Sequence, residues 1–472
     1  MTEFKAGFAQ NDISPETPVQ GRLGINHMIY PYQPISAKAL ALTNGREKHL
    51  IISCETVGFT QSVNKRIKDI ISSRTEINQD NIVIVCTHTH ASPWVWDLQA
   101  EEAAAEGFDV LDHAWLEKVI ANTAQTGMQA MKSMKKCSLR FGKAETQGIA
   151  SNRVHPVTRW SICADDETRN APVGLTDPYV RTISIHPDDR MPAMALANLA
   201  CHPSAYGGGK TTGVSPDFPY AAEINLREFF GGEFIMAYLQ GCAGNINSGK
   251  YVKEGSGEEV DSIGNSLAES IKEAIAGAMD MAAMEVPYLY HYKKFNLPVG
   301  DFVKSPCEAR RQFSVVCDKI KKQDSISDGD VHEWRLALKQ LDVSLLSDGK
   351  RMEIEFQLFR FRDTDMLFVP GEWFVQLYEG LSKANGARNL IVTTMNNFDL
   401  LYIPDEGSMK NKEWYGVRTG MRTLGNESAM LLYKEAAAML CKSRIPSLDK
   451  ERRKGGSQYD VCRKWHGAGD SR

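Results

Sequence analysis

The chain has 472 residues, of which 42% are apolar and 24% charged, a balance typical of a globular protein that buries a large core without disulfides. The formal net charge is only −4 and the two signs are interspersed, which argues against a nucleic-acid partner. No apolar run approaches the roughly 20 residues of a membrane-spanning helix, so we expect no stable membrane association. We predict one large unit at 1–440 and a loose basic C-terminal tail at 441–472.

The cysteines and the N-terminus indicate a cellular location. The first residues lack the apolar segment and cleavage site of a secretion signal. The ten cysteines are scattered and form no Cys-x-x-Cys pair, which predicts reduced thiols and a cytoplasmic protein. Cys86, Cys201 and Cys242 adjoin the motifs described below, and we interpret them as small buried hydrophobes rather than zinc ligands.

Strand and helix patterns alternate along the chain. In order, we predict a strand at 50–54, a helix at 63–77, a strand at 81–86, a helix at 115–131, strands at 181–186 and 194–199, a helix at 218–230, a strand at 234–239 and a helix at 263–279. Charged amphipathic helices at 306–322 and 330–346 then predict a helical insertion or cap at 300–348. Strands resume at 352 and at 389–394. This order predicts an α/β fold of mixed sheets covered by helices.

The motif Thr87-His-Thr-His90 directly follows the apolar strand at 81–86. Side chains two apart on an extended chain face the same side, so both imidazoles can address one site. That site lies at the C-terminal end of a strand, where open α/β sheets place ligands. Taken alone, the pair is compatible with a polar turn as well as with a metal or catalytic site.

Three further motifs repeat this arrangement. His202 follows the strand at 194–199, Glu372 follows a Pro-Gly turn after a strand, and Tyr402 lies downstream of the strand at 389–394. Each has a simpler interpretation by itself: a structural histidine, an acid at a helix N-terminus and a core tyrosine. Their recurrence at strand ends favours one shared site.

Together these motifs resemble the neutral, non-lysosomal ceramidase family and its shorter bacterial relatives, over roughly residues 5–435. The matching segments are 6–15, 87–90, 152–153, 201–202, 240–245, 370–372 and 402–404. The resemblance implies a ceramidase-like catalytic domain that binds one Zn²⁺ ion. The zinc ligands that it implies are His88, His202, Glu372 and Tyr402.

The resemblance also assigns roles to residues around the metal. His90 corresponds to the histidine beside the substrate carbonyl, and Arg153 to the arginine that orients substrate. Tyr415 matches a second tyrosine of the family and is expected to bind substrate. Asp217, in the segment Ser-Pro-Asp-Phe-Pro, is either an acceptor that orients a ligand histidine or a helix cap.

The sequence departs from the family in three places. Asn247 stands where ceramidases carry a catalytic serine, and Ser248 is one residue out of register. The paired histidines are followed by Ala91-Ser-Pro rather than Ser-Gly-Pro. We also see neither the secretion signal nor the C-terminal immunoglobulin-like domain. We therefore expect the metal site to be kept and the substrate to differ from ceramide.

Two imidazoles, a carboxylate and a phenolate suit zinc, which also keeps a position open for water. We predict a hydrolase in which metal-activated water attacks an amide carbonyl, with an ester or a lactone as open alternatives. His90 is the candidate for acid–base work, and Asn247 for orienting substrate or stabilising an oxyanion. Arg153 would hold an anionic or polyhydroxyl part of a small soluble substrate.

The sequence leaves other functions open. A catalytically inactive, metal-dependent protein that binds a small ligand is the main alternative, because Asn247 replaces the serine. The presence of His90 and Arg153 beside the metal ligands favours an enzyme. A metal-dependent lyase or isomerase acting on a sugar acid has no specific support. The sequence makes no prediction of oligomeric state.

Overall fold

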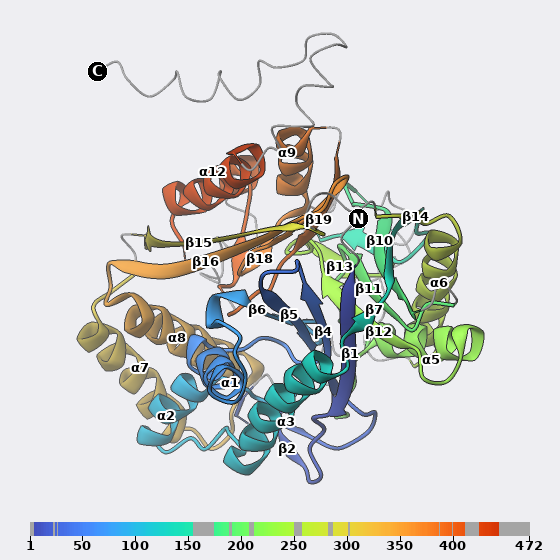
Figure 1. Ribbon diagram of the computed structural model, residues 1–472. Coiled ribbons are helices and arrows are strands. Elements are labelled where there is room, and N and C mark those ends of the chain that lie inside the picture. Colours follow the sequence, from blue (N-terminus) through green and yellow to red (C-terminus); the bar gives the residue numbers. More distant parts are fainter. Residues whose placement is uncertain are drawn as a thin grey trace, which may run out of the picture.

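The computed structural model describes residues 4–21, 24–25, 27–153, 174–187, 191–206, 212–249, 257–281, 287–300, 303–386, 388–398, 400–410 and 424–442. Three main sheets meet near the centre of the molecule, and helices cover their outer faces (Figure 1). The predicted fold class, mixed sheets covered by helices, is confirmed.

The first sheet is built from the N-terminal part of the chain. Its strands, in spatial order, are β6 (Ile82–Cys86), β5 (Lys48–Cys54), β4 (Ser36–Thr43), β1 (Lys5–Asp12) and β7 (Lys135–Lys136). Only the pair β5–β6 is parallel, and α1 (Gln61–Arg74) makes the crossover between them. That helix and α3 (His113–Lys132) pack their apolar residues against one face of the sheet.

The second sheet repeats this plan. Its strands, in spatial order, are β12 (Ile235–Gln240), β11 (Met194–Leu199), β10 (Tyr179–His186), β8 (Ser138–Glu145) and β14 (Met279–Asp280). The parallel pair is β11–β12, and α5 (Phe218–Phe230) connects its strands. Together with α6 (Gly257–Ala276), that helix covers the outer face.

The third sheet comes from the C-terminal part. Its strands, in spatial order, are β15 (Leu289–Pro298), β16 (Arg351–Arg360), β17 (Thr364–Phe368) and β19 (Asn389–Thr393). Here the parallel pair is β17–β19, with α9 (Val375–Asn385) as its crossover helix. This helix packs beside α12 (Asn426–Lys442) on one face of the sheet.

The inner faces of the three sheets share one apolar core. Val83, Leu196 and Phe368, one from each sheet, belong to the same buried cluster. Strands buried on both faces are expected to be apolar. This holds for all of β6, for β12 up to Leu239 and for the last three residues of β17. The core therefore fixes the three parallel strand pairs relative to one another.

The loops at the C-terminal ends of these pairs are hydrogen-bonded across the sheets. The Thr394 N–H after β19 donates to the carbonyl of Gln240 at the end of β12, at 2.8 Å. The Asn397 N–H donates to the carbonyl of Ile84 in β6, at 2.7 Å. Strand ends that are far apart in sequence thus converge on one region.

The predicted helical insertion is a pair of helices, α7 (Pro306–Lys321) and α8 (Asp328–Ser347). Ser305 and Ser327 cap their N-termini by accepting backbone N–H groups. Trp334 of α8 is buried against Trp94, and α8 packs beside α2 (Asp97–Ala105). The domain limits at 1–440 and 300–348 stay predictions.

Most predicted elements are present, with shifted ends. The helix predicted at 63–77 stops at Arg74, because Thr75 adopts an extended conformation. Several strands of the antiparallel parts of the sheets, such as β1, β4 and β8, have no counterpart among the predicted elements. The shorter elements are β2 (Val19–Gln20), β3 (Met28–Ile29), η1 (Gln79–Asn81), β9 (Ala150–Asn152), β13 (Ile246–Ser248), β18 (Glu372–Trp373), β20 (Tyr402–Ile403) and α10 (Glu406–Lys410).

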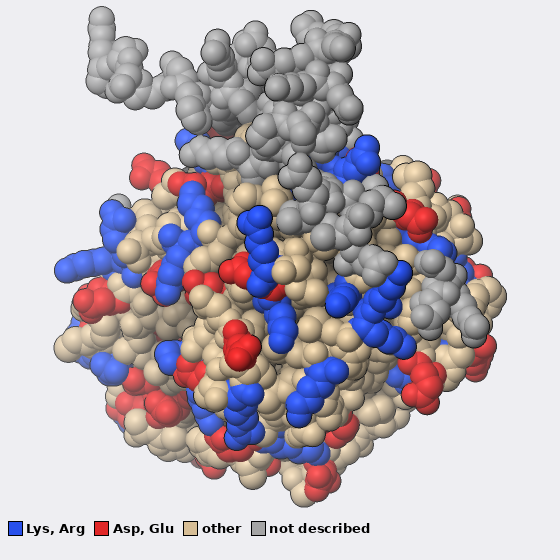
Figure 2. All heavy atoms as spheres, viewed as in Figure 1, with Lys and Arg blue, Asp and Glu red and all other residues tan. Residues whose placement is uncertain are grey.

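Two further findings concern the hydropathy of the helices and the charges on the surface. Among the described residues, no helix combines the length and the hydropathy that crossing a bilayer requires. On the face drawn in Figure 2, acidic and basic side chains are interspersed, as the small net charge leads one to expect. The predicted basic tail beyond residue 442 and Tyr415 lie outside the described residues.

Candidate metal centre

The four predicted ligands lie at the C-terminal ends of parallel strands. His88 follows β6, and His202 follows β11. Glu372 and Tyr402 lie opposite each other in the short parallel ladder of β18 and β20, which follow β17 and β19. All three sheets therefore contribute to one region, as the recurrence of strand-end motifs predicts.

The backbone at His88 is not extended. Its φ angle is 67°, in the left-handed region that non-glycine residues rarely adopt. The His88 N–H donates to the carbonyl of Thr56 at 3.0 Å, which holds the turn in place. His88 and His90 do face one site, as predicted. They do so because the chain turns at His88, so the extended geometry assumed in that prediction is wrong.

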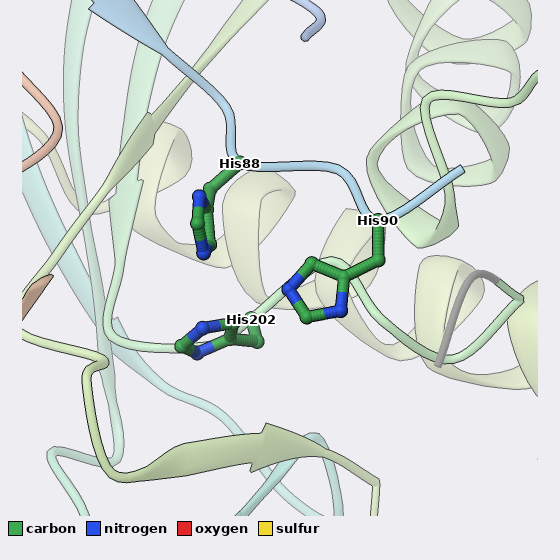
Figure 3. A group of neighbouring side chains, drawn as sticks. All are labelled: His88, His90 and His202. Carbon is green, nitrogen blue, oxygen red and sulfur yellow. The ribbon is translucent and has the colours of Figure 1, made fainter. Parts of the chain in front are cut away.

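Three imidazoles converge in this region. Ring nitrogens of His88, His90 and His202 lie within 4.8 Å of one another. The ring centroids are 4.8 Å apart for His88 and His202, and 5.2 and 5.4 Å from these rings to His90. Figure 3 shows the rings turned toward a common space from two different segments of the chain. In the described part, this is the only such cluster of histidine, cysteine and acidic side chains.

The carboxylate of Glu372 completes a tighter group. Its Oε2 lies 3.0 Å from Nε2 of His202 and 3.3 Å from Nε2 of His88. Ligand atoms of a tetrahedral zinc ion, with bonds of about 2.0–2.2 Å, are about 3.3 Å apart. The two imidazoles and the carboxylate thus have the spacing of a zinc ligand set.

The hydrogen bonds behind the rings fix which nitrogen carries the proton. Nδ1 of His88 lies 2.6 Å from the carbonyl of Val57, and Nδ1 of His202 lies 2.9 Å from the carbonyl of Ile246. A carbonyl oxygen only accepts, so each Nδ1 carries the hydrogen. When each ring is neutral, its Nε2 atom then carries a lone pair that faces the Glu372 carboxylate. Nitrogen lone pairs that face a carboxylate in this way are suited to bind a metal cation.

The ionisation of these groups agrees with metal binding. Burial, together with the positive charge of Arg153, lowers the pKa of His202 to about 3. Although burial alone would raise the pKa of Glu372, the adjacent imidazoles of His88 and His202 hold it well below its ordinary value. Near neutral pH the His202 ring is therefore neutral and the Glu372 carboxylate is ionised, which are the metal-binding forms of these two groups.

Tyr402 and Arg153 are hydrogen-bonded to each other beside this group. The Tyr402 hydroxyl accepts a hydrogen bond from Nη1 of Arg153 at 2.8 Å, and the same nitrogen donates to the carbonyl of Gly244 at 3.2 Å. Nε of Arg153 donates to Oδ1 of Asn247 at 2.7 Å. The structure thus brings together Arg153, Asn247 and Tyr402, and Tyr402 lies beside Glu372 in the ladder of β18 and β20.

Two glycines allow the chain to approach Glu372 closely. Gly371 has a φ of 81°, which the turn before Glu372 requires. A Cβ atom on Gly244 would lie 2.3 Å from the Glu372 carbonyl oxygen. The family-like segments Pro370-Gly-Glu372 and Gln240-Gly-Cys-Ala-Gly-Asn245 therefore fit together at the carboxylate.

Left-handed backbone conformations concentrate in the loops of the site. Six described non-glycine residues have positive φ angles, and one of them, Asp348, merely ends α8. The others are His88, Asp217, Met395, Asn397 and Leu401. Such conformations cost free energy and persist where the surroundings impose them, often at functional sites.

Asp217 acts as a helix cap. Its carboxylate accepts the N–H of Phe218 at the start of α5, and also those of Ala205 and Tyr206 in the turn after His202. Because the Nδ1 atom of His202 bonds the carbonyl of Ile246 instead, the contact of Asp217 is with the turn that follows the ligand. A role as the acceptor that orients a ligand ring stays a prediction.

Other sequence predictions have clear outcomes. Cys86, Cys201 and Cys242 are buried, as interpreted, and none belongs to the histidine cluster. Sequence reasoning missed the carbonyls of Val57 and Ile246, because a backbone acceptor leaves no trace in residue type. Their one signal is position, since Val57 follows β5 and Ile246 follows β12.

The fold is mixed α/β, and its strand ends carry a group of histidine and glutamate side chains that could hold a metal ion. No model of a known protein family matches the sequence, and no curated protein matches it. The structure is similar to neutral ceramidase from Pseudomonas aeruginosa, with 15% identity and a TM-score of 0.66 over 93% of this chain and 74% of that chain. It is also similar to a ceramidase complexed with C2, with 14% identity and a TM-score of 0.69 over 93% and 75% of the two chains. The chain therefore has a neutral ceramidase-like fold.

Proposed function

We propose that this protein is a zinc-dependent hydrolase that cleaves an amide, ester or lactone bond of a small molecule in the cytoplasm. One observation carries the proposal: the Nε2 atoms of His88 and His202, whose Nδ1 atoms bond backbone carbonyls, converge with the Glu372 carboxylate at zinc-ligand spacing. The ligands in this proposal are His88, His202, Glu372 and Tyr402, which hold one ion. When bound, zinc acts as a Lewis acid and lowers the pKa of a bound water to about 7.

His90 is the candidate for proton transfer. It is half-buried, whereas His88 and His202 are buried. A group that exchanges protons with substrate must be reachable from the substrate side. Its ring nitrogen also lies close enough to be a third imidazole ligand. We assign it to proton transfer because the described contacts of Glu372 are with His88 and His202.

Arg153 and Asn247 are the candidates for orienting substrate. Both are half-buried and hydrogen-bonded to each other beside Tyr402. Asn247 cannot serve as a nucleophile, so the proposed reaction depends on water rather than on an acyl-enzyme. The role of Tyr415 in substrate binding belongs to the same proposal.

The amide is the first choice of scissile bond. Its support is the ceramidase-like fold, because the similar structures are of ceramidases. The asparagine at position 247 keeps ester and lactone bonds in the proposal. A water nucleophile on zinc can serve all three, since each presents a carbonyl carbon.

The test is hydrolysis of a panel of small amides, esters and lactones by the zinc-loaded protein. We expect turnover that a chelator abolishes and that added zinc restores. Turnover that is unaffected by the chelator would contradict metal dependence. Tight binding of a panel compound without turnover would instead support the alternative of a metal-dependent binding protein.

A further inference from the structure

Arg153 is a cation without an acidic partner. Its three hydrogen-bond acceptors are the Asn247 amide oxygen, the Gly244 carbonyl and the Tyr402 hydroxyl, and none of them is a carboxylate. Among the described residues, no aspartate or glutamate pairs with it. By contrast, the buried Arg181 and Arg360 each pair with an aspartate. A half-buried charge that lacks a counterion is costly unless a ligand supplies one.

Part of this guanidinium group remains available. Nε and Nη1 are used, whereas Nη2 makes no hydrogen bond within the described part of the chain. Nη2 is attached to the same carbon atom as Nη1, which donates to the hydroxyl of the proposed ligand Tyr402. Nη2 therefore also lies next to the proposed metal ligands. An anion bound there would be close to the metal centre.

Asn247 adds a second donor to this place. Its Oδ1 must face the Arg153 Nε–H, because the reversed amide would set N–H against N–H. The amide orientation is thereby locked, and its Nδ2 has no acceptor among the described residues. Asn247 and Arg153 therefore both present free N–H groups and no hydroxyl nucleophile.

We propose that Arg153 and Asn247 form a carboxylate subsite, so that the substrate is a small acyl compound with a free carboxylate. The inference rests on the proposed function, since it locates the subsite beside the metal centre. The planar fork of an arginine matches the two oxygens of a carboxylate, and such charge-assisted bonds are among the strongest in proteins. The substrate carboxylate supplies the acidic partner that Arg153 lacks among the described residues.

The test measures binding by calorimetry with two probes that differ in one charge. N-acetylglycine carries a carboxylate, and N-acetylglycinamide replaces it by a neutral amide. We expect the full chain to bind N-acetylglycine at least about tenfold more tightly, the scale of one charge-assisted hydrogen bond. Inorganic phosphate, as a third probe, should bind more weakly than N-acetylglycine, and tighter binding of phosphate would overturn the assignment to a carboxylate.

Two variants test whether the preference for N-acetylglycine over N-acetylglycinamide arises at Arg153 and Asn247. Arg153→Gln removes the cation, and Asn247→Asp places a carboxylate against it, so each should bring the two acetylglycine probes to similar affinity. The matched control is Arg140→Gln, which alters a surface arginine paired with Asp280 and should leave the preference unchanged. Zinc content and far-UV circular dichroism are measured for every variant to verify the folded state.

The same titrations with and without zinc separate this inference from the proposed function. A preference that disappears in both variants but survives a chelator supports the subsite even if the hydrolase proposal fails. A preference that both variants retain means that the carboxylate binds elsewhere, for example to the metal, and overturns the inference. A zinc-dependent hydrolase without any preference overturns the inference and leaves the proposed function intact.

Discussion

The protonation of single side chains is set by their surroundings more than by their type. The carbonyls of Val57 and Ile246 fix the rings of His88 and His202, and thereby make both Nε2 atoms available to a metal. Another buried histidine, His49 in β5, is not one of the proposed site residues. Its Nδ1 lies 2.8 Å from the Tyr288 hydroxyl, and burial lowers its pKa to about 4.

His49 predicts a pH dependence of stability. The unfolded chain protonates this imidazole near pH 6.5, whereas the folded protein keeps it neutral down to about pH 4. Between these values the unfolded state binds the extra proton, so the free energy of unfolding falls as the pH falls. The contribution present above pH 6.5 and lost by pH 4 is roughly 3 kcal/mol.

Urea unfolding of the wild type and of His49→Phe between pH 4.5 and 7.5 checks this prediction. The variant should show a flatter dependence over this range, because phenylalanine does not titrate. Parallel curves for the two proteins would show that His49 is not the group concerned.

At the scale of elements, the turns after the parallel strands decide whether the ligands meet. Gly244 lies in the turn after β12 and donates its N–H to the carbonyl of Trp373, at 2.8 Å. The absence of a side chain allows this turn to touch β18, which carries Glu372. The position of the carboxylate therefore depends on a residue from another sheet.

Gly244→Ala is predicted to weaken zinc binding. The added Cβ would lie 2.3 Å from the Glu372 carbonyl oxygen, so the backbone on which the ligand sits must move. We expect at least about a tenfold loss of zinc affinity, the effect typical of disturbed support around a metal site. Gly232→Ala is the matched control, because a Cβ there meets nothing within 4 Å. Equal zinc affinities in the two variants would contradict the prediction.

At the scale of the whole molecule, a buried ionic group links the first sheet to α5, the helix that covers the second sheet. Nζ of Lys38 in β4 lies 2.6 Å from a carboxylate oxygen of Glu55, just after β5, and 2.6 Å from one of Glu223 in α5. Glu223 also pairs with Arg227, which balances the charges. Because Glu55 lies two residues before Val57, the group also supports the turn that orients His88.

Lys38→Met is expected to destabilise the fold strongly. It leaves two buried carboxylates without their shared cation, and breaking such a pair costs about 3–5 kcal/mol. Lys65→Met provides the comparison, since Lys65 pairs with Asp69 at the surface and such pairs are worth at most about 1 kcal/mol. Similar free energies of unfolding for the two variants in urea would refute this role of Lys38.

Much of this architecture could be predicted from the sequence, and for a physical reason. Apolar runs such as 82–86 and 235–239 are visible because strands buried on both faces are mostly apolar. The strand-end positions of His88, His202 and Glu372 are visible for the same reason. The antiparallel strands β1, β4 and β8, the left-handed turn at His88 and the pairing of Arg153 with Asn247 could not be predicted, because they depend on contacts between segments far apart in the chain.

The most direct test of the account is the zinc content of the purified protein by elemental analysis. We expect one zinc per wild-type chain, and its loss in both His88→Ala and Glu372→Ala while far-UV circular dichroism shows a folded protein. His113→Ala, which alters an exposed residue at the start of α3, should retain the ion. Stoichiometric zinc in both ligand variants would contradict the proposed centre.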